Sequence, residues 1–326
     1  MPRIPSEQLI NTLFGPPKTE AGKKLADFAA KSIPKPEKPP SMEAGSFVVH
    51  DAVNPYREAL QAGGAPDSMN PERLDRTVDL EQTLNQSLKI FEQGNLNNWH
   101  EVIKTADFNN LTPENRGLIE KLIKEGWEVT AVMPGKPTTE LKQKEWLQDL
   151  KQSLTTLKPL WIKESQPRMI KDPYIWEYFT ELIDNNNPAL YDNLPERPYI
   201  LLTEPTQKPN PDTCNKKVPE QQNWLTQQQV ARPLLNVMSI GEYAAMQAMF
   251  TRKVNLEAHN KGIPLSALTS LDSQTYTRFI NLPLSTGGNV PNADFFPGNS
   301  QLRWSRDDAD DANSRNGFRL SVRVEI

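Results

Sequence analysis

Apolar residues in the first half of the chain recur every three or four positions, the spacing of one face of a helix. A first helix is predicted from Val78, with Leu84, Leu88 and Phe91 on one side and Gly94 at its end. A later helix has a stripe of leucines at the same spacing, namely Leu147, Leu150, Leu154 and Leu157. Both stripes predict helices that pack one face against a core.

The helix between these two has clearer boundaries. Thr112 is a favoured N-cap residue, Pro113 suits the first turn, and Gly126 lies just past the expected end. Its apolar face consists of Leu118, Ile119, Leu122 and Ile123. Residues 127–133 then alternate in polarity, which predicts a short strand.

An aromatic-rich segment at 172–183 predicts another short helix. Its rings are Tyr174, Trp176, Tyr178 and Phe179. An aromatic ligand box is one interpretation of these rings. Core packing is favoured, because aromatic stripes at helical spacing usually face a core.

Apolar and polar segments alternate in the middle of the chain. Residues 199–202 are uniformly apolar and predict a buried strand, whereas 205–222 are rich in Pro, Lys and Asn and predict a long surface loop. Ser239 and Glu242 have the spacing of a capping box, which predicts a helix start. The inner side of this helix would carry Tyr243, Met246 and Phe250.

Alternating polarity dominates the C-terminal part. Strands are predicted at 271–280, 290–296, 301–305 and 318–324, with a turn at 286–289. Terminal residues are usually poorly ordered unless they join a sheet or core, so the last strand indicates a chain end inside the fold. Helices followed by strands predict an α+β protein.

Composition suggests an N-terminal arm and excludes some partners. The chain has 29 prolines among 326 residues, against an average usage of roughly 5%. Several lie at 33–40, and we interpret residues 1–70 as a proline-rich arm or linker. The length allows two domains after it. A net charge of -4 gives no general basic surface, so no nucleic-acid partner is expected.

Candidate catalytic chemistry is sparse. Cys214 is the single cysteine, so no intrachain disulfide can form, and Lys216 and Lys217 could lower its pKa. The three histidines, His50, His100 and His259, are not spaced as metal ligands usually are. No nucleophile elbow or glycine-rich phosphate loop is present. We therefore expect no enzymatic reaction, no cofactor and no metal centre.

Two further patterns restrict location and ligand type. No apolar run has the length of a membrane span, and no signal peptide is evident, so a cytoplasmic or virion-associated protein is expected. The acidic run at 307–311 differs from a calcium loop at Ala309 and Ala312, and no Glu closes it. A solvated acidic loop is the favoured interpretation.

The final strand carries a family resemblance. The motif Gly317-Phe318-Arg319-Leu320 closes the chain after a strand with Trp304 and a polar loop. This arrangement resembles the formylglycine-generating-enzyme branch of the C-type lectin fold, which the variable proteins of diversity-generating retroelements share. The resemblance covers about residues 230–326, and residues 299–304 replace the usual Gly-Gly-Ser-Trp.

The resemblance implies a C-type-lectin-like ligand-binding domain at 196–326, behind a mainly helical region at 71–195. In the variable proteins a reverse transcriptase mutates template adenines, so diversified positions hold residues such as Asn, Asp, Ser, Phe, Arg and Ala. The candidate variable residues are Asn289, Asn292, Ala293, Asp294, Phe295, Phe296, Asn299, Ser300, Arg303, Ser305, Asp307, Asp308, Asp310, Asp311 and Asn313. The expected scaffold consists of Trp304, Gly317, Phe318 and Arg319.

The function implied is ligand binding through a displayed face at 289–313. The partner would be a protein or glycan on a target surface, and the N-terminal region would attach the protein to a virion or cell surface. Enzymes of this branch need two active-site cysteines for copper or a set of histidines for iron, so this chain better matches the binding proteins. A degenerate or altered enzyme of the formylglycine-generating type and a structural virion component remain the alternatives.

Overall fold

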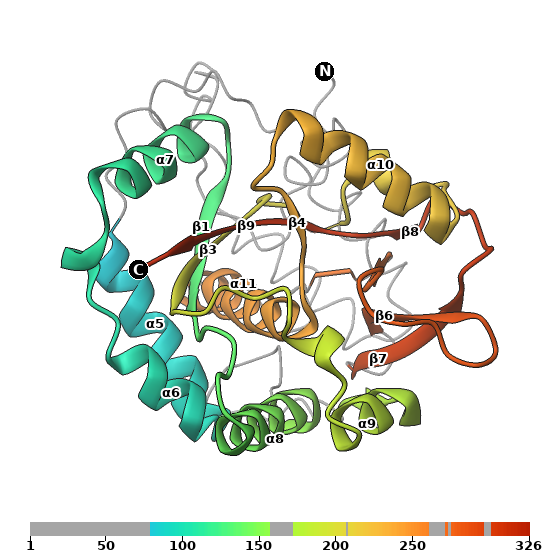
Figure 1. Ribbon diagram of the computed structural model, residues 1–326, viewed down its shortest axis with the longest axis horizontal. Helices are drawn as coiled ribbons and strands as arrows, with labels where there is room; N and C mark the ends of the chain where they lie inside the picture. Colours follow the sequence, from blue (N-terminus) through green and yellow to red (C-terminus); the bar gives the residue numbers. More distant parts are fainter. Residues whose placement is uncertain (1–78, 157–171, 207, 261–270, 273–274, 297–300) are drawn as a thin grey trace, which may run out of the picture.

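The computed structural model describes residues 79–156, 172–206, 208–260, 271–272, 275–296 and 301–326, with no side chains described at 251–260. Helices lie mostly in the N-terminal part and strands mostly in the C-terminal part (Figure 1). The protein is therefore α+β, as predicted. The expected arm at 1–70 lies outside the described residues.

Sheet A contains four antiparallel strands and crosses the middle of the molecule (Figure 1). Its order is β1 (Glu128–Met133), β3 (Tyr199–Thr203), β9 (Leu320–Glu325) and β4 (Asn236–Val237). The C-terminal strand thus lies between two others, with Val324 opposite Ile200. The predicted burial of the chain end in the fold is confirmed.

Sheet B contains five strands in the order β2 (Tyr174–Ile175), β7 (Gln301–Asp308), β6 (Asn289–Phe296), β5 (Tyr276–Arg278) and β8 (Asn316–Gly317). The long pair β6 and β7 is antiparallel and forms the centre of the sheet. The outer strands β2 and β8 pair in parallel with β7 and β5.

Five helices from the N-terminal part of the chain lie along the left and lower sides of the molecule in Figure 1. They are α5 (Leu80–Gln93), α6 (Asn97–Lys104), α7 (Pro113–Lys124), α8 (Glu140–Thr156) and α9 (Glu177–Asp184). Helices α5, α6 and α7 lie beside β1, whereas α8 and α9 form the lower rim and reach sheet B through β2. Short 3-10 turns at Phe108–Asn110 and Pro188–Leu190 complete this part.

Helix α11 (Ile240–Asn260) is the internal helix of the fold. It packs against β1, α5 and α8, and its described side chains up to Ala248 are buried. Its start follows the predicted capping box: the Ser239 backbone N–H donates to Glu242 Oε2 at 2.7 Å, and the Glu242 N–H donates to Ser239 Oγ at 3.2 Å. A helix that is apolar on nearly all sides belongs in a core.

The segment predicted as a long surface loop at 205–222 is partly helical and partly buried, so that prediction was wrong. It contains a 3-10 turn at Pro211–Thr213 and the start of α10 (Val218–Ala231). The Lys217 N–H donates to the Glu220 carboxylate at 2.8 Å, which stabilises the first turn of α10. Thr213 and Gln221 are fully buried.

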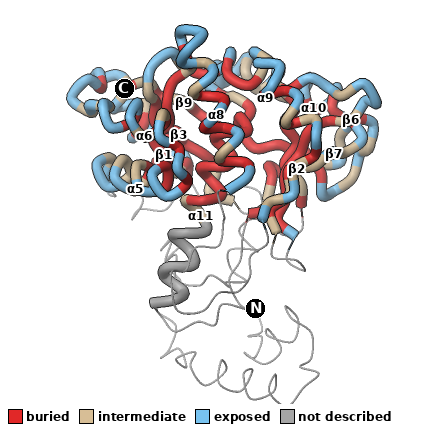
Figure 2. Tube along the Cα trace, turned by 90° about the horizontal axis from the view of Figure 1, so that it is seen from below, coloured by how far each residue is buried: buried red, intermediate tan, exposed pale blue. Residues whose placement is uncertain are grey.

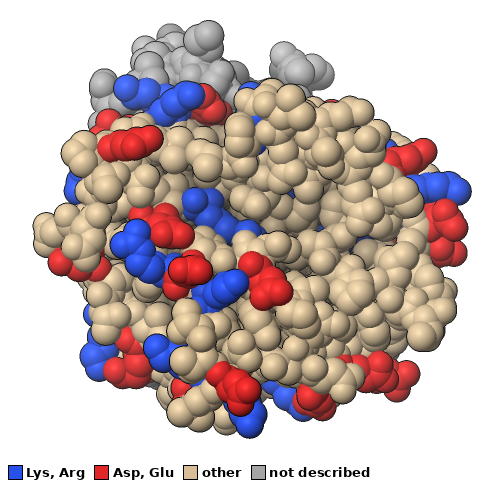
Figure 3. Space-filling view, in the orientation of Figure 1, with Lys and Arg blue, Asp and Glu red and all other residues tan. Residues whose placement is uncertain are grey.

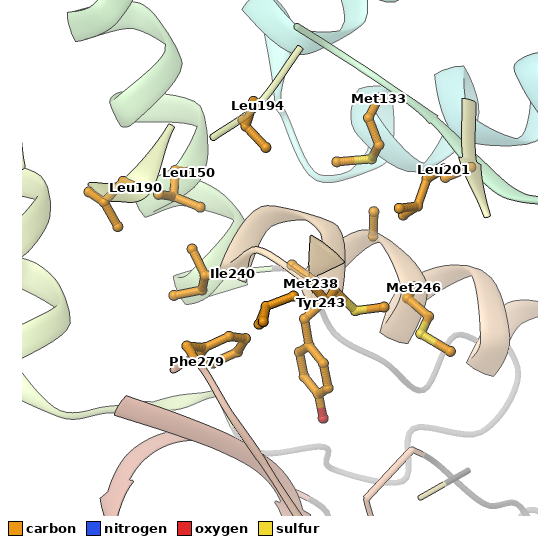
Figure 4. Close-up of a cluster of buried hydrophobic side chains, with 14 of the residues drawn as sticks. Met133, Leu150, Leu190, Leu194, Leu201, Met238, Ile240, Tyr243, Met246 and Phe279 are labelled. Atoms are coloured by element: carbon orange, nitrogen blue, oxygen red, sulfur yellow. The ribbon is translucent and has the colours of Figure 1, made fainter. Parts of the chain in front are cut away.

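A single hydrophobic core joins both halves of the chain. Figure 4 shows Met133 from β1, Leu150 from α8, Leu201 from β3 and Tyr243 from α11 in one cluster. Buried residues form one continuous block in Figure 2, with exposed residues around it. The boundary expected at 195/196 does not separate two cores, because β1 from the helical region pairs with β3 beyond it.

Helix ends agree with their predicted signals in all but one detail. Thr112 Oγ1 accepts from the Asn115 N–H at 3.1 Å at the start of α7, and Gly126 follows its end with φ 96°. Helix α5 ends at Gln93, but Gly94 keeps a right-handed φ of −78°. The left-handed residue is Asn95, with φ 55°, which an Asn tolerates better than most residues.

Most predicted strands are present. Strands β1, β3, β6, β7 and β9 match the predicted segments, although β7 is three residues longer than expected. The segment at 271–280 contributes only the three-residue β5. The helix prediction at 172–183 was wrong for its first residues, because Tyr174–Ile175 form β2 and α9 starts at Glu177. Core packing is confirmed for Trp176 and Phe179, which are buried, but was wrong for the exposed Tyr174. Leu157 lies outside the described residues.

Candidate functional site

The two long strands of sheet B separate the candidate site residues into two faces. Residues directly opposite each other in neighbouring strands share a face, and alternate residues of one strand share it too. Asp294 lies opposite Arg303, and Ala293 lies opposite Trp304. The Ala293 side of the sheet is apolar, and the Asp294 side carries polar groups.

The apolar side faces the core. Trp304 is fully buried, stacks on Phe279 at 6.3 Å between ring centroids, and meets Tyr243 edge-on at 5.7 Å. Its indole Nε1 donates to the Leu154 carbonyl of α8 at 3.0 Å. The expected scaffold role of Trp304 thus has a physical basis in packing across two elements.

The polar side is defined here as the outer face of sheet B. It includes the following residues of β2, β5, β6 and β7: Tyr174, Asn292, Asp294, Phe296, Gln301, Arg303, Ser305, Asp307 and Arg278. Exposure on this face rises toward the Phe296 end of the hairpin. Phe296 and Tyr174 are exposed by 41% and 49%, whereas Arg278 and Asn292 are buried.

Asp294 and Arg303 form a paired charge at the centre of the outer face. Arg303 Nη2 donates to Asp294 Oδ2 at 2.5 Å, and Nε donates to both carboxylate oxygens at 3.1 Å. The guanidinium also lies over the Phe296 ring, 4.7 Å from its centroid. Burial raises the pKa of Asp294 to about 6, although the Arg303 pairing opposes that rise.

The acidic segment at 307–311, which begins at the end of β7, wraps around Arg278. This fully buried guanidinium donates to the Asp307 carboxylate and to the carbonyls of Lys216, Asp308 and Asp311. Burial raises the pKa of Asp307, and the hydrogen bond from Arg278 lowers it in part. The prediction of a simply solvated loop is therefore wrong for Asp307 and Asp311, while Asp308 and Asp310 are exposed.

The closing motif at 317–320 packs against the segment at 209–214. A Cβ added at Gly317 would lie 2.7 Å from Thr213 Oγ1 and 2.8 Å from Pro209 Cβ, so these neighbouring side chains leave no space for a larger residue. The Phe318 N–H donates to Thr213 Oγ1 at 3.0 Å. Gly317 is thus required for close approach, not for an unusual φ.

Arg319 of the same motif is buried in a polar cluster. Its Nη2 donates to Asp272 Oδ1 at 2.9 Å, and Nη1 donates to the Thr206 carbonyl at 2.9 Å. The Tyr243 and Thr277 hydroxyls donate to the other Asp272 oxygen, Oδ2. Phe318 is fully buried and meets the Trp224 ring of α10. These contacts give the expected scaffold residues a structural role.

The expected displayed face is only partly accessible. Exposed or half-buried candidates are Asn289, Phe296, Arg303, Ser305, Asp307, Asp308, Asp310, Asp311 and Asn313. The expectation of exposure is wrong for Asn292, Ala293, Asp294 and Phe295, which are buried. Ala293 and Phe295 face the core, and Asp294 is covered by its ion pair. Asn299 and Ser300 lie outside the described residues.

Sequence reasoning missed three residues that shape this region. Arg278 and Asp272 lie in a segment that was predicted as a strand, and Tyr174 lies in one that was predicted as a helix. None of the three was predicted to belong to the site. An arginine beside the apolar Phe279 in a predicted strand was an available signal for Arg278, because a buried arginine needs several acceptors. The contacts of Asp272 and Tyr174 depend on long-range pairing, which local patterns do not reveal.

Cys214 and the histidines form no common cluster in the described residues. Burial raises the pKa of the Cys214 thiol, and Lys216 opposes this rise only in part, so the expected lowering was wrong. His100 is half-buried beside Glu101, with 3.6 Å between Nδ1 and Oε1. His50 and the His259 side chain lie outside the described part. Within that part, no three His, Cys, Asp or Glu residues are grouped to hold a metal ion.

Charged side chains are unevenly spread over the surface in Figure 3. Opposite charges lie side by side near the middle of the face that Figure 3 shows. Surface ion pairs among the described residues include Lys136–Asp192 and Arg197–Glu325. The region of α10 is mostly uncharged, because no charged residue occurs from Gln221 to Ala231. Neither region is a continuous basic surface.

Comparison with known proteins found no relative. No protein-family model, no curated protein and no solved structure matches the chain. In the part of the chain that the structure describes, no helix has both the length and the apolar character needed to cross a membrane.

Proposed function

We propose that the chain is a ligand-binding display protein of the kind diversified by retroelements, with a C-type-lectin-like C-terminal part. One observation carries the proposal: along β7, buried Leu302 and Trp304 alternate with the half-buried Arg303 and Ser305 of the outer face, whereas β6 is buried from Val290 to Phe295 and exposed at Phe296. Asp294, Arg303 and Ser305 lie opposite the core side. Exchanging accessible outer-face residues such as Phe296 or Ser305 alters a surface, whereas exchanging Ala293 or Trp304 would disturb packing.

The accessible end of the outer face has the chemistry of a macromolecular binding site. Phe296 and Tyr174 offer exposed aromatic area, and Arg303 and Ser305 add polar groups beside them. Aromatic and arginine side chains are enriched where proteins bind one another. The proposed partner is a protein or glycan on a target surface. Attachment to a virion or cell surface would be the task of the N-terminal region.

The position of the scaffold supports the same proposal. β9 lies between β3 and β4, and Arg319 and Phe318 hold the preceding segment through contacts that do not involve Phe296 or Arg303. A binding surface that changes its sequence needs a frame with independent stability. The contacts that hold Phe318 and Arg319 are therefore separate from those of Phe296 and Arg303.

The DNA beside the gene gives the decisive test. We expect a near-copy of the 3' coding region that differs from it almost only at adenines, next to a reverse transcriptase gene. The differing codons should include those of Phe296, Arg303 and Ser305 and should spare those of Trp304 and Gly317. A flanking sequence without such a repeat overturns the proposal.

A further inference from the structure

The loop at 307–316 has an internal support that its acidic composition does not suggest. Arg278 is 0% exposed, yet it lies next to a polar loop instead of the apolar core. Its guanidinium contacts one carboxylate and three backbone carbonyls, from Asp307, Asp308, Asp311 and Lys216. A buried arginine with this many acceptors has little conformational freedom.

We propose that Arg278 is a positioning residue that fixes the path of the 307–316 loop. Asp307 and Asp311 are then anchors that must stay constant, and Asp308 and Asp310 are the positions free to vary and set ligand specificity. The part concerning specificity rests on the proposed function. The part concerning the loop path does not.

The carboxylates of Asp307 and Asp311 accept hydrogen bonds from neighbouring side chains. Asp307 receives hydrogen bonds from Arg278 and from the Asn316 side-chain amide. Asp311 Oδ2 accepts from Asn313 Nδ2 at 2.6 Å and from Asn316 Nδ2 at 3.3 Å. Loss of the Asp307 carboxylate leaves the Nε–H of the buried Arg278 without this acceptor, which is costly in a protein interior. Loss of the Asp311 carboxylate removes one of the two acceptors of the Asn316 amide.

The two proposed free positions have different surroundings. Asp310 is 77% exposed and contacts Lys217 Nζ at 3.2 Å, a surface ion pair of small energetic value. Asp308 is exposed, and its side chain accepts a local hydrogen bond from the Asp310 N–H at 2.8 Å. Its contact with Arg278 is made by the backbone carbonyl, which any residue supplies.

A second segment holds the loop from the other side. The Asn215 N–H donates to the Asn313 carbonyl at 3.0 Å, and the Val218 N–H donates to the Ala309 carbonyl at 2.9 Å. Arg278 reaches this segment as well through the Lys216 carbonyl. Since the bonds from Asn215 and Val218 go to backbone carbonyls of the loop, they do not depend on the side chains at 308 and 310.

The test is hydrogen exchange of the full chain, with Asp307→Ala and Arg278→Lys compared with the matched control Asp310→Ala. We expect amides of 307–316 to exchange at least about tenfold faster in the first two variants, as expected for local opening. Amides of α8 should keep their rates. Asp310→Ala should match the unchanged protein.

Unchanged loop exchange in both Asp307→Ala and Arg278→Lys overturns the positioning role. If either variant fails to fold, Asp307→Asn keeps the shape and one acceptor but removes the charge, and its loop exchange decides in the same way. Faster exchange in Asp310→Ala equal to that in Asp307→Ala would overturn the division into anchors and free positions.

The two proposals can fail separately. Faster loop exchange without any template repeat in the flanking DNA would support Arg278 as a positioning residue and refute the display function. A template repeat with adenine differences at the Asp308 and Asp310 codons, but not at those of Asp307 and Asp311, supports both. If the codons of all four aspartates differ equally at adenines, the division into anchors and free positions is refuted.

Discussion

Three arginines of the C-terminal part have side chains that are almost completely buried. Arg278, Arg319 and Arg323 are exposed by 0%, 3% and 4%, and each contacts a carboxylate. Arg323 Nε donates to Glu242 Oε1 at 2.7 Å, so the capping-box glutamate also neutralises a charge of β9. Alternation of polar and apolar residues does not predict the burial of these arginines, because it cannot show that a strand is covered on both faces.

The buried carboxyl of Glu204 is expected to make the stability of the protein depend on pH. Burial raises its pKa from 4.5 to about 7, although Asn210 Nδ2 donates to it at 2.7 Å. The folded state therefore binds a proton between about pH 4.5 and pH 7 that the unfolded state releases. Stability from this group is present at low pH and is lost as the pH rises through 7.

Glu204→Gln keeps the acceptor oxygen and removes this titration. We expect the fall in Tm between pH 5 and pH 8.5 to shrink by about 3–6 °C in the variant, measured by differential scanning calorimetry. Glu120→Gln on the exposed side of α7 is the control and should leave the fall unchanged. An equal fall in Glu204→Gln and the unchanged protein would refute the assigned proton linkage.

At the scale of elements, amphipathic helices were more predictable than polar connections. The α7 boundaries followed from Thr112, Pro113 and Gly126, because caps act within one turn. The segment at 209–217 gave no such local pattern. Its structure depends on Thr213, whose hydroxyl contacts the Phe318 backbone more than a hundred residues away.

Gly317→Ala tests this packing between β8 and the 209–214 segment. The added methyl group would overlap Thr213, Pro209 and Cys214, so we expect the free energy of unfolding to fall by about 1–3 kcal/mol. Urea denaturation measures this change.

Gly117→Ala is a matched control within α7. No atom lies within 4 Å of its added Cβ, so the same substitution should raise the free energy of unfolding by about 0.5–1 kcal/mol. Equal effects of the two substitutions would contradict the close approach at Gly317.

The outer face of sheet B was partly predictable. Residue types at 289–313 indicated a polar region, and the alternation of Leu302, Arg303 and Trp304 indicated one buried and one accessible side. The burial of Asp294 was not predictable, because it depends on the cross-strand pairing with Arg303. A local pattern cannot identify such a partner.

At the scale of the whole molecule, the helical region and the strand-rich region form one unit. β1 supplies an edge strand to sheet A, and Ile90, Leu150 and Val324 belong to the same core. The sequence pattern separated them at 195/196 because helices dominate one side. Long-range strand pairing overrides that composition boundary.

A fragment of residues 79–195 tests this unity. We expect it to lack a cooperative thermal transition by circular dichroism, because β1 would lose β3 and the core would lose its C-terminal members. The full chain, measured in parallel, should unfold cooperatively. A sharp transition in the fragment would instead support an independent helical domain.

The central place of β6 and β7 in sheet B has a consequence for self-association. Neighbouring strands pair with both of them, β5 with β6 and β2 with β7, so the middle of each strand has no free backbone edge. Open strand edges are the usual templates for aggregation. A second chain could therefore add edge to edge to sheet B at its outer strands β2 and β8, but not at the middle of the two strands that carry most of the outer face.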